Sequence, residues 1–76
     1  MNNKKRMSLK EAVGFLNKAY DIIDDVLDRE EDCLDNIPEN LQDSETCERI
    51  EDAVDKLQEA VESITAAIEA TEAASE

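Results

Sequence analysis

Apolar residues in the C-terminal half of the chain recur at alternating steps of three and four. The positions are Cys47, Ile50, Val54, Leu57, Val61, Ile64, Ile68 and Thr71. This seam repeats every seven residues for more than three heptads, which is typical of a helix that packs along its length against another helix. With Cys47 as heptad position a, position g holds only alanine, at residues 53, 60, 67 and 74. Such a strip of small side chains lets a second helix approach closely.

The N-terminal half follows the same period with a broader apolar face. Ser8-Leu-Lys-Glu11 is a capping-box pattern, so we predict that a first helix begins at Ser8 after a basic flexible arm at residues 1–7. With Leu9 at position a, apolar residues occupy positions a, d, e and g, whereas b, c and f are polar or Gly. Pro38 disfavours helix at Ile37, and Ser44 can cap a second helix. The predicted elements are a helix at 8–35, a turn at 36–43 and a helix at 44–73.

These elements predict an all-α fold in which one domain of 76 residues forms an antiparallel two-helix hairpin with coiled-coil-like packing. A single Gly, a single Pro and only two aromatic residues argue against a sheet. A chain this short also has difficulty burying a sufficient core by itself.

The first helix carries more apolar surface than one neighbouring helix can cover. We predict an exposed ridge that serves as an oligomer interface, made of the e and g positions Val13, Phe15, Tyr20, Ile22, Leu27 and Leu34. Two hairpins would then pack their first helices together into a four-helix bundle, most simply a homodimer. The alternative is a ridge that binds a different protein.

The net charge of −13 is distributed unevenly. Residues 1–18 hold five basic residues and one acidic residue, whereas residues 19–76 hold three basic and twenty acidic residues. Antiparallel pairing should place the basic N-terminal segment beside Glu69, Glu72 and Glu76. Such an acidic surface disfavours direct nucleic-acid binding, and mutual repulsion should make self-association stronger at higher salt.

The residue types offer little chemistry. The chain has no His, which is the commonest general base and metal ligand, and no base is available to activate its serines. Seven carboxylates fall on the outer face of the first helix: Asp21, Asp24, Asp25, Asp28, Glu31, Asp32 and Asp35. They lack the order of an EF-hand loop and fit a solvated acidic face better than a cation site. We therefore expect no catalytic residue, no cofactor and no metal centre.

Cys33 and Cys47 lie at equivalent distances from the turn and are predicted to face one another. Three alternatives remain open: a pair of buried thiols, a disulfide that closes the hairpin, or a zinc site shared between subunits. No export signal and no apolar run of membrane-spanning length is present, so we expect a cytoplasmic protein with reduced cysteines and no membrane partner.

The connection reads Asp35-Asn-Ile-Pro-Glu-Asn-Leu-Gln-Asp-Ser-Glu45, preceded by Arg29-Glu-Glu-Asp-Cys33. Together with the Glu- and Ala-rich heptads, it resembles a group of small acidic helical-hairpin proteins from Firmicutes and their phages. The resemblance implies a mobile-element origin and carries no activity or site residue with it. The first hypothesis is thus a non-enzymatic, self-associating interaction module. The second is a phage anti-defence protein that mimics DNA with its carboxylates or sequesters a small signal molecule.

Overall fold

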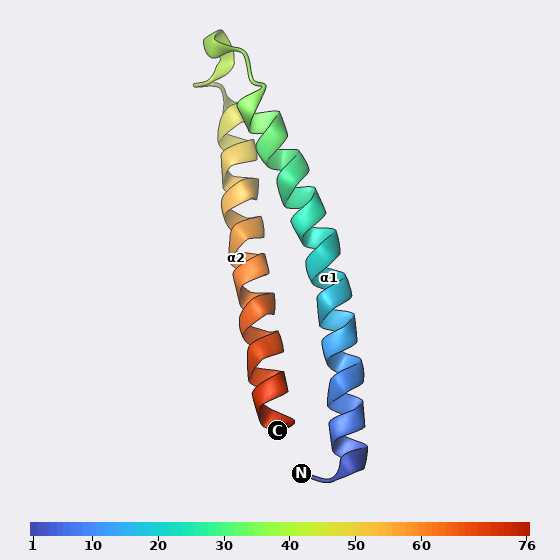
Figure 1. The fold of residues 1–76 in the computed structure, drawn as a ribbon. Helices are drawn as coiled ribbons and strands as arrows, with labels where there is room; N and C mark the ends of the chain where they lie inside the picture. Colours follow the sequence, from blue (N-terminus) through green and yellow to red (C-terminus); the bar gives the residue numbers. More distant parts are fainter.

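A computed structural model describes all 76 residues as two long helices joined by a short connection. Helix α1 spans Asn3–Asp35, a 3₁₀ turn η1 spans Glu39–Leu41, and helix α2 spans Glu45–Ala74. The two helices pack against each other in opposite directions, with both termini at the same end of the molecule (Figure 1). The predicted all-α antiparallel hairpin is confirmed.

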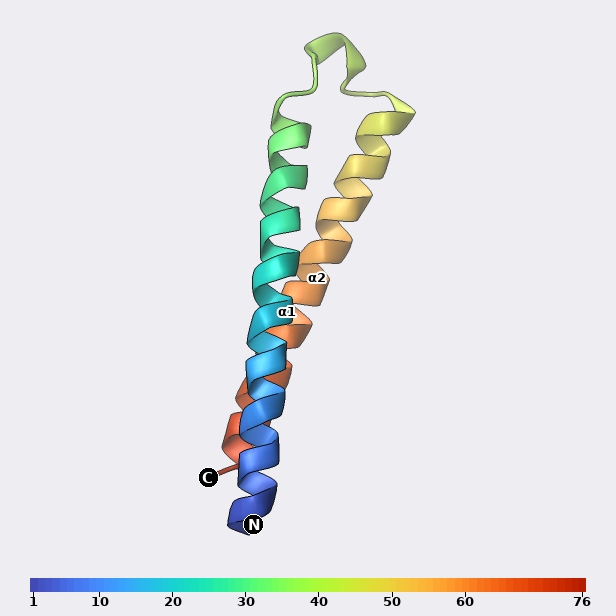
Figure 2. The same cartoon turned by 90° about the vertical axis from the view of Figure 1, so that its right-hand side faces the viewer.

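The hairpin is a narrow rod of 59 × 14 × 13 Å. Its radius of gyration is 17.3 Å, compared with about 11 Å for a compact domain of this length. The two helices separate toward the termini in Figure 1 and toward the connection in Figure 2, which shows that they cross at a shallow angle. Most of each helix surface is therefore left to face solvent or another molecule.

Helix α1 begins five residues earlier than the sequence predicted, so the expected start at Ser8 is wrong. The side chain of Asn2 caps the helix by accepting a hydrogen bond from the Lys5 amide at 2.8 Å. Ser8 is inside the helix, where its hydroxyl donates to the Lys4 carbonyl at 3.2 Å. Asn is as good a cap as Ser, and the Lys, Arg and Met residues between them are good helix formers. Residues 3–7 of the predicted flexible arm are consequently part of the first two turns of α1.

The connection ends α1 and starts α2 as predicted. The Asn36 side-chain amide donates to the Asp32 carbonyl at 2.8 Å and closes the last turn of α1, two residues before Pro38. At the start of α2, the Ser44 hydroxyl accepts from the Cys47 amide at 3.2 Å. Glu45 and Glu48 lie in the first turn, where the helix dipole favours negative charge.

The core of the hairpin is very small. Only Leu27 of α1 and Cys47 and Val54 of α2 are buried. The other apolar residues between the helices are half-buried, including Leu9, Leu16 and Ile23 of α1. One neighbouring helix covers only one side of each apolar seam, which explains the shortage of buried residues.

Candidate interaction surface

The six residues predicted to form an exposed ridge separate into two groups. Leu27 is only 7% exposed, and Val13, Tyr20 and Leu34 are half-buried, so the e positions of α1 contribute to packing against α2. The prediction that Leu27 is left uncovered in a single hairpin is wrong. Five turns of a straight helix take 18 residues, so Leu27 lies in line with Leu9 rather than one position to its side.

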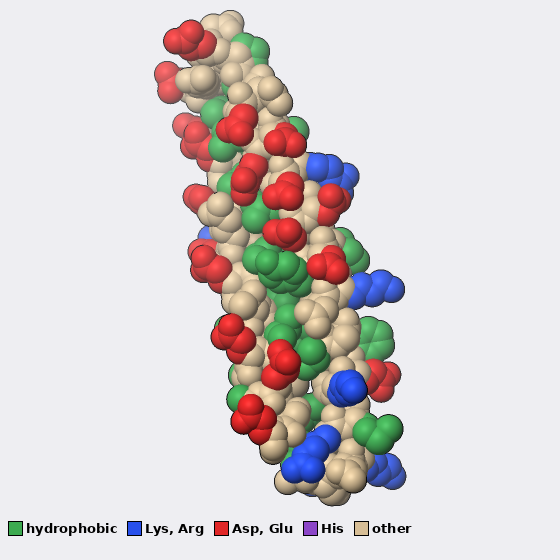
Figure 3. Space-filling view, in the orientation of Figure 1, with side chains coloured by type: hydrophobic (Ala, Val, Ile, Leu, Met, Phe, Trp, Pro, Cys, Tyr) green, Lys and Arg blue, Asp and Glu red, His purple; other side chains and the backbone are tan.

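The g positions of α1 remain uncovered. Phe15 is 66% exposed and Ile22 is 59% exposed, and they lie two turns apart on the same side of the helix. Figure 3 shows apolar side chains projecting between basic ones along the outer edge of α1 in its N-terminal half. Phe15 and Ile22 are thus two large, exposed apolar residues close together on one side of α1. Met7, which is 72% exposed at an f position, lies on a different side of the helix.

Helix α2 presents its own half-buried apolar residues on the same side of the rod, because g positions adjoin each other in an antiparallel helix pair. We call this side the g face. Its half-buried members are Ala12, Ala19 and Val26 of α1 and Ile50, Ala53, Leu57, Ala60, Ile64 and Ala67 of α2. Phe15 and Ile22 are its exposed members. The g face is therefore an apolar surface shared by both helices.

The shape of the g face follows from its side-chain sizes. The large side chains of Phe15 and Ile22 project from α1. Alanine occupies residues 12 and 19 of α1 and residues 53, 60 and 67 of α2. These small side chains alternate with the larger half-buried Val26, Ile50, Leu57 and Ile64. One surface therefore carries both projecting residues and positions where a second helix can approach closely.

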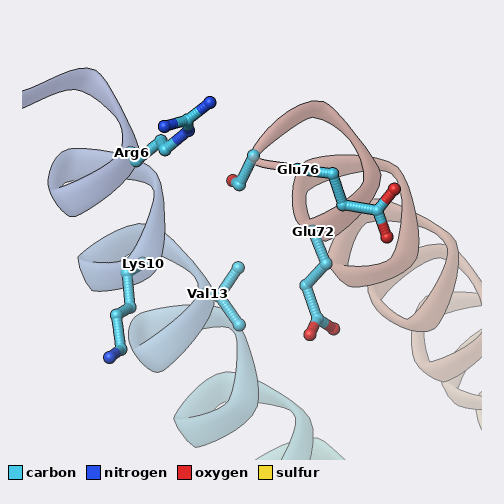
Figure 4. A pocket seen from close by; sticks show the side chains of 6 residues that line it. Arg6, Lys10, Val13, Glu72 and Glu76 are labelled. Carbon is cyan, nitrogen blue, oxygen red and sulfur yellow. The ribbon is translucent and has the colours of Figure 1, made fainter. Parts of the chain in front are cut away.

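The open end of the hairpin contains two shallow clefts between the helices. One cleft of about 330 Å³ is lined by Arg6, Lys10, Val13, Glu72, Ser75 and Glu76 (Figure 4). A second of about 350 Å³ lies beside Tyr20 and is bordered by Thr65 and Ile68 of α2. The helices thus pack less closely here than around Leu27 and Val54.

The first cleft partly confirms the charge arrangement expected from the sequence. Arg6 and Lys10 of α1 border the same cleft as Glu72 and Glu76 of α2. No ion pair spans it, and in Figure 4 the Glu76 side chain extends away from α1. The three ion pairs of the chain all lie within one helix and are exposed: Asp25–Arg29, Glu45–Arg49 and Lys56–Glu59. Exposed pairs of this kind contribute only tenths of a kcal/mol each.

Cys33 and Cys47 do not form the predicted pair. Cys47 is buried and Cys33 is exposed, and both are free thiols. Cys33 follows Phe15 by 18 residues, so it lies in line with that exposed residue rather than toward α2. Burial raises the pKa of the Cys47 thiol, and the neighbouring Glu51 carboxylate, which accepts a 3.7 Å hydrogen bond from the thiol, raises it further. Cys33 is therefore the more reactive thiol of the native hairpin.

The acidic side chains follow both helices along the face seen in Figure 3 and flank its central apolar strip. No group of three or more His, Cys, Asp or Glu side chains is arranged to hold a metal ion. Neither helix has the length and apolar character needed to cross a membrane.

Comparisons with protein-family models, with curated proteins and with solved structures give no match. The resemblance to small acidic proteins of Firmicutes and their phages stays a prediction. The g face is accordingly the feature of the molecule that bears most directly on its function.

Proposed function

We propose that this protein is a non-enzymatic interaction module that associates with a second copy of itself through the g face. The observation that carries the proposal is the exposure of Phe15 and Ile22 beside the alanine positions of both helices. A two-fold interface uses the same patch on both subunits, so that patch must be complementary to itself. The g face fits this condition, because each copy supplies both the projecting residues and the alanine positions against which they can pack.

The area of the hairpin supports the same conclusion. Its accessible surface is 5801 Å², whereas a compact monomer of 8.5 kDa exposes about 4,700 Å². The excess of about 1,100 Å² is comparable to the area of about 800 Å² that each partner buries in a stable interface. Covering the g face with a second hairpin would produce a four-helix bundle whose accessible area is closer to that of a compact protein of its mass.

Charge density argues against a single hairpin that mimics DNA. A net charge of −13 along 59 Å averages one charge per about 4.5 Å, compared with one per about 1.7 Å in duplex DNA. The half of the rod nearest the termini carries no net charge, so the acidic array covers only about half of its length. The apolar g face also has no part in such mimicry. Self-association is the function that the surface of the chain supports best.

The mass of the protein in solution tests the proposal. We expect light scattering at micromolar concentration to give twice the chain mass of 8.5 kDa. Raising the salt from low to physiological and higher concentrations should strengthen the dimer, because screening weakens repulsion between two chains of charge −13. A monomer at every salt concentration would overturn the proposal and would leave the g face to a different protein.

A further inference from the structure

The net charge of the hairpin is concentrated in one half of the rod. The half nearest the connection, residues 19–59, holds sixteen acidic and three basic residues, a net charge of −13. The half nearest the termini, residues 1–18 and 60–76, holds five acidic and five basic residues and is neutral. We call these the tip half and the open half. Figure 3 shows the same separation, with Lys and Arg gathered toward the open end of α1.

This distribution distinguishes the two ways in which the g faces of two rods can meet. With the connections at the same end, two tip halves of charge −13 would lie side by side at a helix spacing of about 10 Å. Most of the carboxylates lie on the outer faces of the helices, so their separation exceeds the Debye length of about 8 Å at physiological salt, and this repulsion is greatest at low salt. With the connections at opposite ends, each tip half would lie beside a neutral open half. The two tip halves would then be separated by about half of the 59 Å rod, several Debye lengths.

The charges of α1 are also the reverse of those that stabilise a lone helix. Its first turn has no acidic residue and its last turn has no basic residue. Lys4, Lys5 and Arg6 lie instead near the positive end of the helix dipole, and Asp32 and Asp35 near the negative end. An antiparallel neighbour of the same sequence would place the basic end of each α1 beside the acidic end of the other.

The position of the exposed apolar residues fits the same arrangement. The midpoint between Phe15 and Ile22 nearly coincides with the midpoint of α1, which spans Asn3–Asp35. A two-fold axis at that point would let the two α1 helices overlap along their whole length. It would also bring Phe15 of each copy against the partner's Ile22.

The geometry points to an antiparallel dimer, in which the connection of each hairpin lies at the open end of the other and the two-fold axis passes between Phe15 and Ile22. This inference rests on the proposed self-association and adds the orientation of the two copies. The basic start of α1 then has a definite role, since it attracts the acidic tip half of a second copy and sets its direction.

Distances between spin labels on Cys33 test the orientation. Cys33 is exposed in the last turns of α1, and Cys47 is buried, so a thiol-reactive nitroxide should label Cys33 selectively. In the antiparallel dimer, the two labels lie on opposite sides of the two-fold axis. Their separation along the rod equals the length of about 29 helical residues, or about 44 Å. In a dimer with both connections at one end, the labels would be one or two helix diameters apart, on the order of 10–20 Å. Pulsed dipolar spectroscopy separates these ranges.

A second label position near the two-fold axis provides the control. Lys18→Cys in a Cys33→Ser chain places the label almost level with the axis, so a distance on the order of 10–20 Å is expected in either orientation. A long distance from Cys33 together with a short one from residue 18 supports the antiparallel dimer. Short distances from both positions would overturn the orientation and leave self-association standing. Absence of dipolar coupling at both positions, with a monomer mass for the labelled chains, would overturn self-association itself.

Discussion

Replacing Leu27 by alanine is expected to lower the free energy of unfolding by about 2–5 kcal/mol, the usual cost of truncating a buried leucine. Leu27 is the only buried residue of α1. A domain of 76 residues has a total stability of about 4–11 kcal/mol, so this one change removes a large fraction of it. Urea unfolding followed by far-ultraviolet circular dichroism measures the difference.

Leu41→Ala is the matched control for this prediction. Leu41 lies in the η1 turn and is 48% exposed, so the same deletion should change the free energy of unfolding by less than about 0.5 kcal/mol. Equal effects at the two positions would mean that Leu27 is not part of the packing between α1 and α2. If Leu27→Ala halved the solution mass without altering monomer stability, the sequence-based prediction that Leu27 belongs to the oligomer interface would be correct.

The double substitution Phe15→Asp and Ile22→Asp is expected to dissociate the dimer. Truncating a central interface residue costs about 2 kcal/mol, and each substitution occurs twice in a two-fold interface. Even one such substitution should therefore weaken association by roughly 1,000-fold, and the double variant by more. Light scattering at micromolar concentration should report the mass of a single chain.

Ala66→Asp is the matched control for the double variant. Ala66 is exposed at an f position of α2, on the side of that helix away from α1 and the g face. It adds one negative charge per chain, compared with two in the double variant, without touching the proposed interface, so the dimer mass should be unchanged. A double variant that keeps the dimer mass would show that the copies associate through another surface. Circular dichroism of the variants shows whether the separated hairpin still folds.

The sequence predicted the fold well because local signals agreed with one another. The heptad seam of α2, the Ser44 cap and the break before Pro38 each predicted what the structure contains. The start of α1 was predicted wrongly because two cap residues, Asn2 and Ser8, compete at the same terminus. Asn2 makes the cap, and helix continues through Ser8, because the Lys, Arg and Met residues between them favour helix. The Ser8 hydroxyl donates to the Lys4 carbonyl within the helix.

The candidate surface was predicted only in part, and one physical cause explains the errors. A strict seven-residue repeat was applied to α1, but a straight helix drifts by about 20° per heptad relative to that repeat. Over 18 residues the drift brings Leu27 into line with Leu9 and Cys33 into line with Phe15. Leu27 is therefore buried and Cys33 exposed, the reverse of the prediction. Phe15 and Ile22, which lie nearer the middle of α1, were assigned to the exposed surface correctly.

The single phenylalanine of the sequence allows a direct measurement of whether a second copy of the chain covers the g face. Nuclear Overhauser effects can be recorded in a mixture of isotope-labelled and unlabelled chains, filtered to retain only contacts between copies. A dimer joined through the g face should give cross-peaks from the Phe15 ring of one copy to isoleucine and alanine methyl groups of the other. If the Phe15 ring shows contacts only within its own chain, and the mass at the same concentration is that of a monomer, then no second copy covers the g face.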